Sequence, residues 1–202
     1  MSILKDLNFV KGESNLAASI FEGLTSEGKT FLDVKYSSPS EYINYFWDKY
    51  QKVEKKTANQ NGKVFELIVS TLLYRENLKP LYIQAEVAFV PNVDFDALLY
   101  SKEVGPIALS MKTSLRERYK QADLEAIALK YVHRKAKSYL LTMDENEARI
   151  TKEKIVSGSI IGLDKIILCS GEDMDSLIAD LKNYQYTLAG SIEIIKSTQV
   201  VK

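Results

Sequence analysis

The spacing of apolar residues changes abruptly in the middle of the chain, and this change restricts the fold more than any other feature. Over Gly62–Arg75 the apolar residues recur at helical spacing. Three short runs typical of β-strands follow, separated by turn residues: Leu81–Val90, Val93–Tyr100 and Ile107–Lys112. Ser114–Lys137 is then predicted to be one long helix, with Ser114 and Glu117 in the pattern of a capping box. A helix, three strands and a second helix in this order indicate a mixed α/β domain.

Further helices and strands are expected on both sides of this central part. Helices are predicted at Asn15–Leu24, Ser40–Lys56, Asp144–Ser157 and Met174–Tyr184, and strands at Ser138–Thr142, Lys165–Cys169 and near Ser191–Ile195. The sequence thus predicts an α/β fold with a central mixed β-sheet flanked by helices. We expect a helical N-terminal segment over residues 1–60 and a core domain over residues 61–202.

The composition excludes several classes of protein. With 202 residues, 46% of them hydrophobic, the chain suits a single globular domain. No apolar run is long enough for a membrane span, and the lone Cys169 is expected to be buried, which fits a reducing, prokaryotic-type cytoplasm. The sequence holds no Cys/His cluster for zinc and no glycine-rich phosphate loop, so we expect no dependence on ATP.

The charges are unevenly distributed along the chain. The formal net charge is zero, yet residues 112–137 contain eight Lys or Arg against three acids. Such a basic stripe can contact phosphates in a neutral protein, or it can simply be a solvated helix face. The face expected to be exposed comprises Arg116, Lys120, Asp123, Lys130 and Arg134.

Four charged side chains fall where the pattern favours apolar ones. Asp96 precedes four apolar strand residues, Lys112 ends an otherwise apolar strand, and Glu125 and Glu66 lie on the apolar sides of their helices. Burying such charges is unfavourable unless they are paired or bind a metal. They are therefore either buried salt bridges or a site in which the acids hold Mg²⁺ and the lysine acts on a water. Asp94, on the same strand face as Asp96, is the alternative metal ligand.

The motif formed by Asp96 and Ser110-Met111-Lys112 resembles the D…(D/E)-x-K signature of the PD-(D/E)XK nuclease superfamily. The core of that superfamily has the same order of helix, three-stranded meander, helix and strand. Ser110 stands where the second acid of the signature is usual. A subgroup of restriction endonucleases (SsoII, PspGI, EcoRII and NgoMIV) makes a similar exchange and takes the acid from the following helix. The residue at the matching distance, 13 positions after Lys112, is Glu125.

The resemblance, which covers roughly residues 62–169, implies a Mg²⁺-dependent, site-specific deoxyribonuclease. The catalytic residues that it implies are Asp96, Lys112, Glu125 and Glu66, of which the three acids are the metal ligands. In the subgroup, an R-E-R triplet shortly after the lysine reads the C·G pairs of CC…GG sites. Its counterpart here is Arg116-Glu117-Arg118. The expected DNA-binding residues are this triplet together with Ser110, Ser114 and Lys120.

We therefore expect a type II restriction endonuclease with a restriction-endonuclease-like core over residues 61–202. One chain holds one set of motifs, and cutting both strands of a duplex takes two, so a homodimer on a palindromic or near-palindromic DNA site is expected. Residues 1–60 would contact DNA or form the dimer. Two alternatives stay open: a repair or structure-directed nuclease of the same fold, and a DNA-binding module whose active site has decayed.

Overall fold

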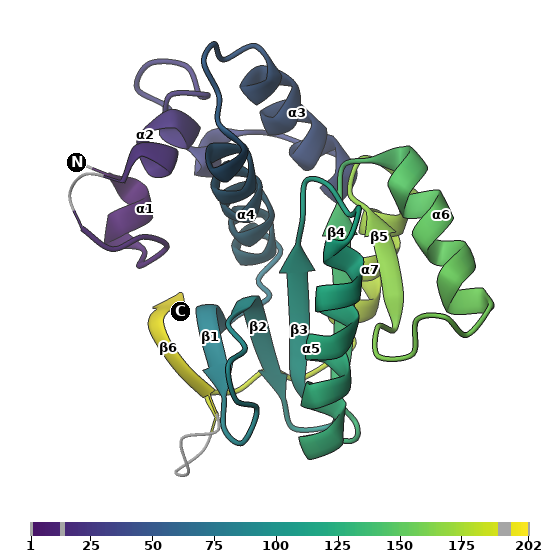
Figure 1. Cartoon of the computed structure of the whole chain (residues 1–202). Coiled ribbons are helices and arrows are strands. Elements are labelled where there is room, and N and C mark those ends of the chain that lie inside the picture. The colour runs from purple at the N-terminus through teal and green to yellow at the C-terminus, as the bar shows by residue number, and fades with distance from the viewer. Residues whose placement is uncertain (1, 13–14, 190–194, 202) are drawn as a thin grey trace.

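The computed structural model describes residues 2–12, 15–189 and 195–201, which form one six-stranded sheet with helices on both faces (Figure 1). The strands are β1 (Leu81–Val87), β2 (Phe95–Ser101), β3 (Gly105–Met111), β4 (Lys137–Thr142), β5 (Lys165–Leu168) and β6 (Ile195–Val201). Their order is β5-β4-β3-β2-β1-β6. The pairs of β1 with β6, β1 with β2 and β2 with β3 are antiparallel, whereas β3–β4 and β4–β5 are parallel. The predicted mixed sheet is thus confirmed.

The helices form two layers on this sheet. They are α1 (Ile3–Asp6), α2 (Leu16–Glu22), the 3₁₀ helix η1 (Phe31–Asp33), α3 (Pro39–Gln51), α4 (Ala58–Arg75), α5 (Arg118–Val132), α6 (Glu145–Val156) and α7 (Glu172–Leu181). Successive side chains of β3 point to opposite faces of the sheet and so pack against different helix layers. Leu109 and Met111 pack into the core under α3, α4 and α7, while Ala108 packs with Leu129 of α5 on the opposite face. None of the helices in the described ranges is both long and apolar enough to cross a membrane.

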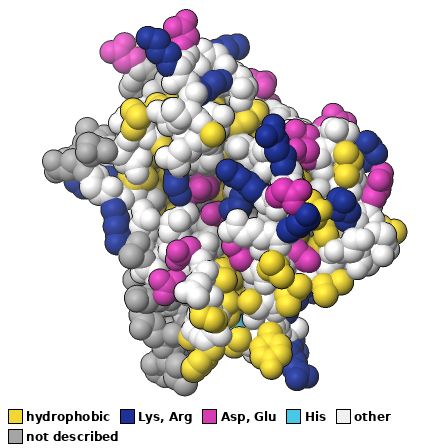
Figure 2. All heavy atoms as spheres, viewed as in Figure 1, with side chains coloured by type: hydrophobic (Ala, Val, Ile, Leu, Met, Phe, Trp, Pro, Cys, Tyr) yellow, Lys and Arg dark blue, Asp and Glu magenta, His cyan; other side chains and the backbone are white. Residues whose placement is uncertain are grey.

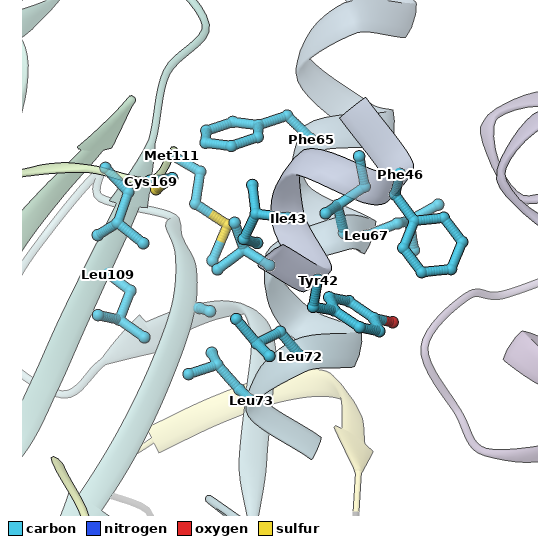
Figure 3. Close-up of a cluster of buried hydrophobic side chains, with 14 of the residues drawn as sticks. Tyr42, Ile43, Phe46, Phe65, Leu67, Leu72, Leu73, Leu109, Met111 and Cys169 are labelled. Atoms are coloured by element: carbon cyan, nitrogen blue, oxygen red, sulfur yellow. The ribbon is translucent and has the colours of Figure 1, made fainter. Parts of the chain in front are cut away.

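The N-terminal segment shares its hydrophobic core with the sheet. Phe9, Phe21 and Phe31 are almost fully buried in the same cluster as α3 and α4. The rings of Phe21 and Phe46 stack with their centroids 4.8 Å apart. Figure 3 shows how the side chains of α3 and α4 meet Leu109 of β3 across this core. Cys169 is fully buried in the same cluster, so its expected place in the core is confirmed.

Helix α5 is shorter at both ends than the sequence predicts. It begins at Arg118 instead of Ser114 and ends at Val132 instead of Lys137. The capping box predicted for Ser114 is wrong, because Glu117 occupies the N-cap position and makes no side-chain cap bond. The Ser114 hydroxyl donates instead to Glu147 of α6.

The C-terminal strand is also displaced from its prediction. The sequence places it near Ser191–Ile195, and the structure has β6 over Ile195–Val201. Residues 191–194 lie outside the described part of the chain.

Asp123 does not belong to the exposed face of α5, which corrects the prediction. Only 9% of its surface is accessible, and its Oδ1 accepts the N–H groups of Gly162 (2.6 Å) and Leu163 (3.1 Å). The loop between α6 and β5, which contains Gly162, approaches α5 so closely that a Cβ at Gly162 would lie 2.4 Å from the Asp123 carbonyl oxygen. The carboxylate faces inward because the amides of this docked loop have no strand or helix partners of their own.

We expect Asp123→Ala to lower the free energy of unfolding by about 2–3 kcal/mol, because it leaves buried N–H groups without an acceptor. Urea unfolding of both proteins measures the difference. The matched control is Leu124→Ala, the next residue of α5, whose side chain is 67% exposed. Equal losses for the two variants would contradict this account of the loop.

Candidate active site

Strands β2 and β3 separate at the point where the predicted catalytic residues lie. Their ladder runs as far as the pair Ala97–Leu109 in the described sheet, whereas β3 continues along β4 to the pair of Met111 with Leu141. The Met111 N–H donates to Oδ2 of Asp96 at 2.7 Å. The Asp96 carboxylate thus replaces the backbone acceptor that the Met111 N–H lacks on β2. This bond fixes the Asp96 side chain in the opening between the strands.

Lys112 is held at the same carboxylate. Its Nζ donates to Oδ2 of Asp96 at 2.7 Å, and its backbone N–H donates to the Leu141 carbonyl at 3.0 Å. The two charged side chains are mostly buried, with 17% of Lys112 and 11% of Asp96 exposed. The backbone at the end of β3 therefore aims the lysine at the opening.

Glu66 of α4 lies near this pair. Its carboxylate accepts from Lys63 Nζ at 2.9 Å and from Gln84 Nε2 at 3.0 Å. Burial raises the pKa of Glu66, and the negative charge of Asp96 raises it further. The sequence pattern found the glutamate but not its partner Gln84.

Gln84 interrupts the ladder between β1 and β2. Its φ is +48°, a conformation that is rare for residues other than glycine. It lies between the pairs Ile83–Ala97 and Ala85–Phe95, opposite Asp96. The strained residue Gln84 of β1 thus lies opposite the catalytic candidate Asp96 of β2.

Glu125 of α5 lies near the pair from the other face of the sheet. Its Oε1 accepts from Gln121 Nε2 at 2.7 Å. Burial raises the pKa of Glu125; Lys112 lowers it and Asp96 raises it. Asp96 and Lys112 therefore act electrostatically on both Glu66 and Glu125. Asp94, the alternative ligand, is exposed ahead of β2 and contributes to the negative charge at Glu125.

The triplet Arg116-Glu117-Arg118 is exposed, in the loop before α5 and at its first residue. Lys120 pairs with Glu117 at 2.5 Å on the surface. Figure 2 shows basic and acidic side chains intermixed across the middle of this face of the molecule.

Of the two predicted DNA-binding serines, one is buried and the other is hydrogen-bonded within the protein. Ser110 is buried in β3, with 6% of its surface accessible, and Ser114 bonds to Glu147. The role of Glu147 was not found from the sequence, because an acid in the first turn of a helix is ordinary there.

The acids are not gathered into a preformed cage. Among the described residues, no group of three or more His, Cys, Asp or Glu side chains is clustered as a metal site requires. The acids do present carboxylate oxygens, the ligands that Mg²⁺ takes in proteins. A divalent cation between them would offset the repulsion from Asp96 that raises the pKa of Glu66 and of Glu125.

The mixed sheet, the helices on both faces and the opening between β2 and β3 define a restriction-endonuclease-like fold. A solved structure of this fold, the restriction endonuclease PspGI in complex with its substrate DNA, matches the chain with a TM-score of 0.53. The match covers 77% of this chain and 71% of that one, at 16% sequence identity. No protein-family model matches the chain, and no curated protein is significantly similar to it.

The raised pKa of Glu125 predicts a pH-dependent effect of Glu125→Gln on stability. At a pH below the ordinary value of about 4.3, the carboxyl is neutral in both states and the variant should match the parent. As the pH rises above that value, ionisation is less favourable in the folded state than in the unfolded state, so the parent loses stability that the variant keeps.

Urea unfolding between roughly pH 4 and pH 8 in the presence of EDTA measures this difference. The control is Glu54→Gln, at an exposed position. A difference between parent and Glu125→Gln that does not grow with pH would show that burial does not govern the Glu125 carboxyl.

Proposed function

We propose that the chain is a Mg²⁺-dependent type II restriction endonuclease that cuts both strands of DNA at a short, palindromic CC…GG-type site. The observation that carries the proposal is the contact of Lys112 with Asp96 in the opening between β2 and β3. Such an ion pair alone is also compatible with a purely structural role. Glu66 and Glu125, whose pKa values are raised by burial, bring two further acids to the same place. Acids whose pKa values are shifted by burial and by charged neighbours, gathered at one place, are typical of active sites.

The residues fit a magnesium ion in their chemistry. Asp96 and Glu125 would hold it, with Glu66 as an outer ligand. Among the described contacts of Asp96, both hydrogen bonds end on Oδ2, so the lone pairs of Oδ1 are available to a cation. When bound, the ion supplies positive charge at the scissile phosphate and the leaving oxygen.

Lys112 would act on the attacking water. Its ammonium group carries three N–H donors, of which Asp96 takes one, so it can also hold a water and a phosphate oxygen. Water attacks the phosphorus, the bond from phosphorus to the 3′ oxygen breaks, and a 5′-phosphate and a 3′-hydroxyl result. The water loses its proton to solvent, because the Lys112 ammonium group has no lone pair to accept it, and the leaving 3′ oxygen takes a proton from solvent.

DNA would bind over the loop that follows Lys112. Exposed Arg116 and Arg118 can donate to guanine O6 and N7, and Glu117 can accept from cytosine N4. Lys120, which is exposed, is the remaining proposed DNA contact, whereas Ser110 is buried and Ser114 is bonded to Glu147. The PspGI structure is itself a DNA complex, and this supports DNA as the ligand of the shared fold. Residues 1–60 are proposed to contact DNA or the second protomer.

The primary test is digestion of a plasmid of known sequence with Mg²⁺ and, in parallel, with EDTA. Discrete fragments that require Mg²⁺, with ends mapping to one short sequence, are expected. Cutting at random positions would favour a nuclease without sequence specificity, and no cutting at all would contradict the proposal.

Lys112→Ala and Glu125→Ala should each reduce the cleavage rate by roughly 10²-fold or more, because Lys112 would stabilise the charge that develops at the phosphate and Glu125 would hold the metal ion. The cleavage rate of the plasmid measures the loss. The control is Lys165→Ala, which removes a surface ion pair with Asp180. DNA binding in Ca²⁺ should survive Lys112→Ala. If Glu125→Ala cuts at the parental rate, Glu125 is not the second acid.

Arg118→Ala and Glu117→Gln should weaken binding to the cognate duplex by about 1–3 kcal/mol, with little change for a scrambled duplex, because base contacts discriminate sequence. Affinities in Ca²⁺ at several salt concentrations measure both. A phosphate contact would instead weaken both duplexes equally and reduce the salt dependence. Equal losses would therefore remove the proposed reading role.

The complex with a cognate duplex should contain two protomers, because each chain carries one set of catalytic residues. Light scattering of the protein with the duplex in Ca²⁺ gives the mass of the complex. A mass of one protomer per duplex would exclude the symmetric dimer.

A further inference from the structure

We propose that Glu147 of α6 is a positioning residue that fixes the direction in which the Arg116-Glu117-Arg118 loop reads DNA. This inference rests on the proposed function and adds a specificity determinant to it. Glu147 lies more than thirty positions from the loop in sequence, and its carboxylate is bound by three donors of that loop.

The three contacts involve both oxygens of the carboxylate. Oε2 accepts the Leu115 N–H at 2.5 Å. Oε1 accepts the Arg116 N–H and the Ser114 hydroxyl, each at 3.4 Å. Successive backbone N–H groups that converge on one anion form a concave site that holds the loop in a single conformation.

Glu147 is itself held rigidly, so it can serve as a fixed point. Its N–H donates to the N-cap Asp144 at 2.8 Å, and its carbonyl accepts from Thr151 at 2.6 Å. Leu115 is anchored in addition by its side chain, which is 1% exposed in the core beneath α5 and α6. The loop is therefore attached through both its backbone and its apolar side chain at the same residue.

The loop needs such an attachment because its conformation is unfavourable. Arg116 has a φ of +23°, which a side chain with a Cβ rarely adopts. A strained residue of this kind persists only when its surroundings impose it. The carboxylate supplies that constraint chiefly through its short bond to the neighbouring Leu115 N–H, and its contact with the Arg116 N–H is longer, at 3.4 Å. The strained backbone sets where the exposed Arg116 side chain points.

Glu147 also connects the proposed DNA-reading loop to the proposed catalytic lysine. The loop begins directly after Lys112, whose Nζ lies on Asp96, and the attachment follows within three residues. The carboxylate thus limits how far the loop can move relative to the catalytic lysine. A loop released from it would still carry two arginines for DNA but would present them to base edges in several orientations.

The test compares Glu147→Ala and Glu147→Gln with the parent on a plasmid of known sequence, and maps every cut by sequencing the ends. The glutamine offers one acceptor oxygen in place of two, so it should be intermediate. The matched control is Glu145→Gln, which removes the same charge from the same helix turn at an exposed position. Melting temperatures of all variants are measured alongside.

We expect Glu147→Ala to cut the parental site roughly tenfold more slowly or worse, and to cut additional sites that differ from it at one base pair. Glu145→Gln should keep the parental sites and rate. A cut spectrum that is unchanged in Glu147→Ala, or a loss of rate that is equal at all sites, would overturn the inference while leaving the proposed function standing. A parental chain that cuts nothing would overturn both.

A second measurement does not depend on cleavage. Amide hydrogen exchange over residues 113–118 should be slow in the parent and at least roughly tenfold faster in Glu147→Ala, with no change over β3. Unchanged exchange in this segment would show that Glu147 does not hold the loop, whatever the stability of the variant.

Discussion

The site depends on one carboxylate oxygen, Oδ2 of Asp96, which accepts both the Met111 N–H and the Lys112 ammonium. The first bond replaces a ladder partner that β3 loses where β2 diverges from it. The second places the only cation of the proposed catalytic set. A polar backbone group left open by the divergence would otherwise be buried without a partner, so the same side chain that stabilises the opening also defines the site within it.

Glu66 of α4 and Glu125 of α5 lie near Asp96 from opposite faces of the sheet. Burial makes their ionised forms less favourable, and so does the charge of Asp96. A domain selected for stability alone would place amides or apolar side chains there. The two acids are therefore the part of the molecule in which stability and the proposed activity make opposite demands.

Much of this arrangement follows from local patterns in the sequence. The strand pattern identified Lys112 as a charge at the end of an otherwise apolar strand, and helix periodicity found Glu66 and Glu125 on the apolar sides of their helices. Patterns of this kind work where the residue and its environment belong to one element. They failed at Ser114, whose capping-box spacing was matched by chance while a distant helix supplied the real partner. They could not find Gln84, Glu147 or the inward turn of Asp123, because each binds groups far away in sequence.

The close docking of Gly162 on α5 has a mechanical consequence. With the loop amides bound to Asp123, and with β5 directly after that loop, α5 cannot slide along its axis without carrying the β5 edge of the sheet with it. Helix α5 and the β5 edge of the sheet are thus tied to each other. Because β2 is joined to β3 by five ladder pairs, this attachment also keeps Glu125 of α5 in place relative to Asp96 of β2.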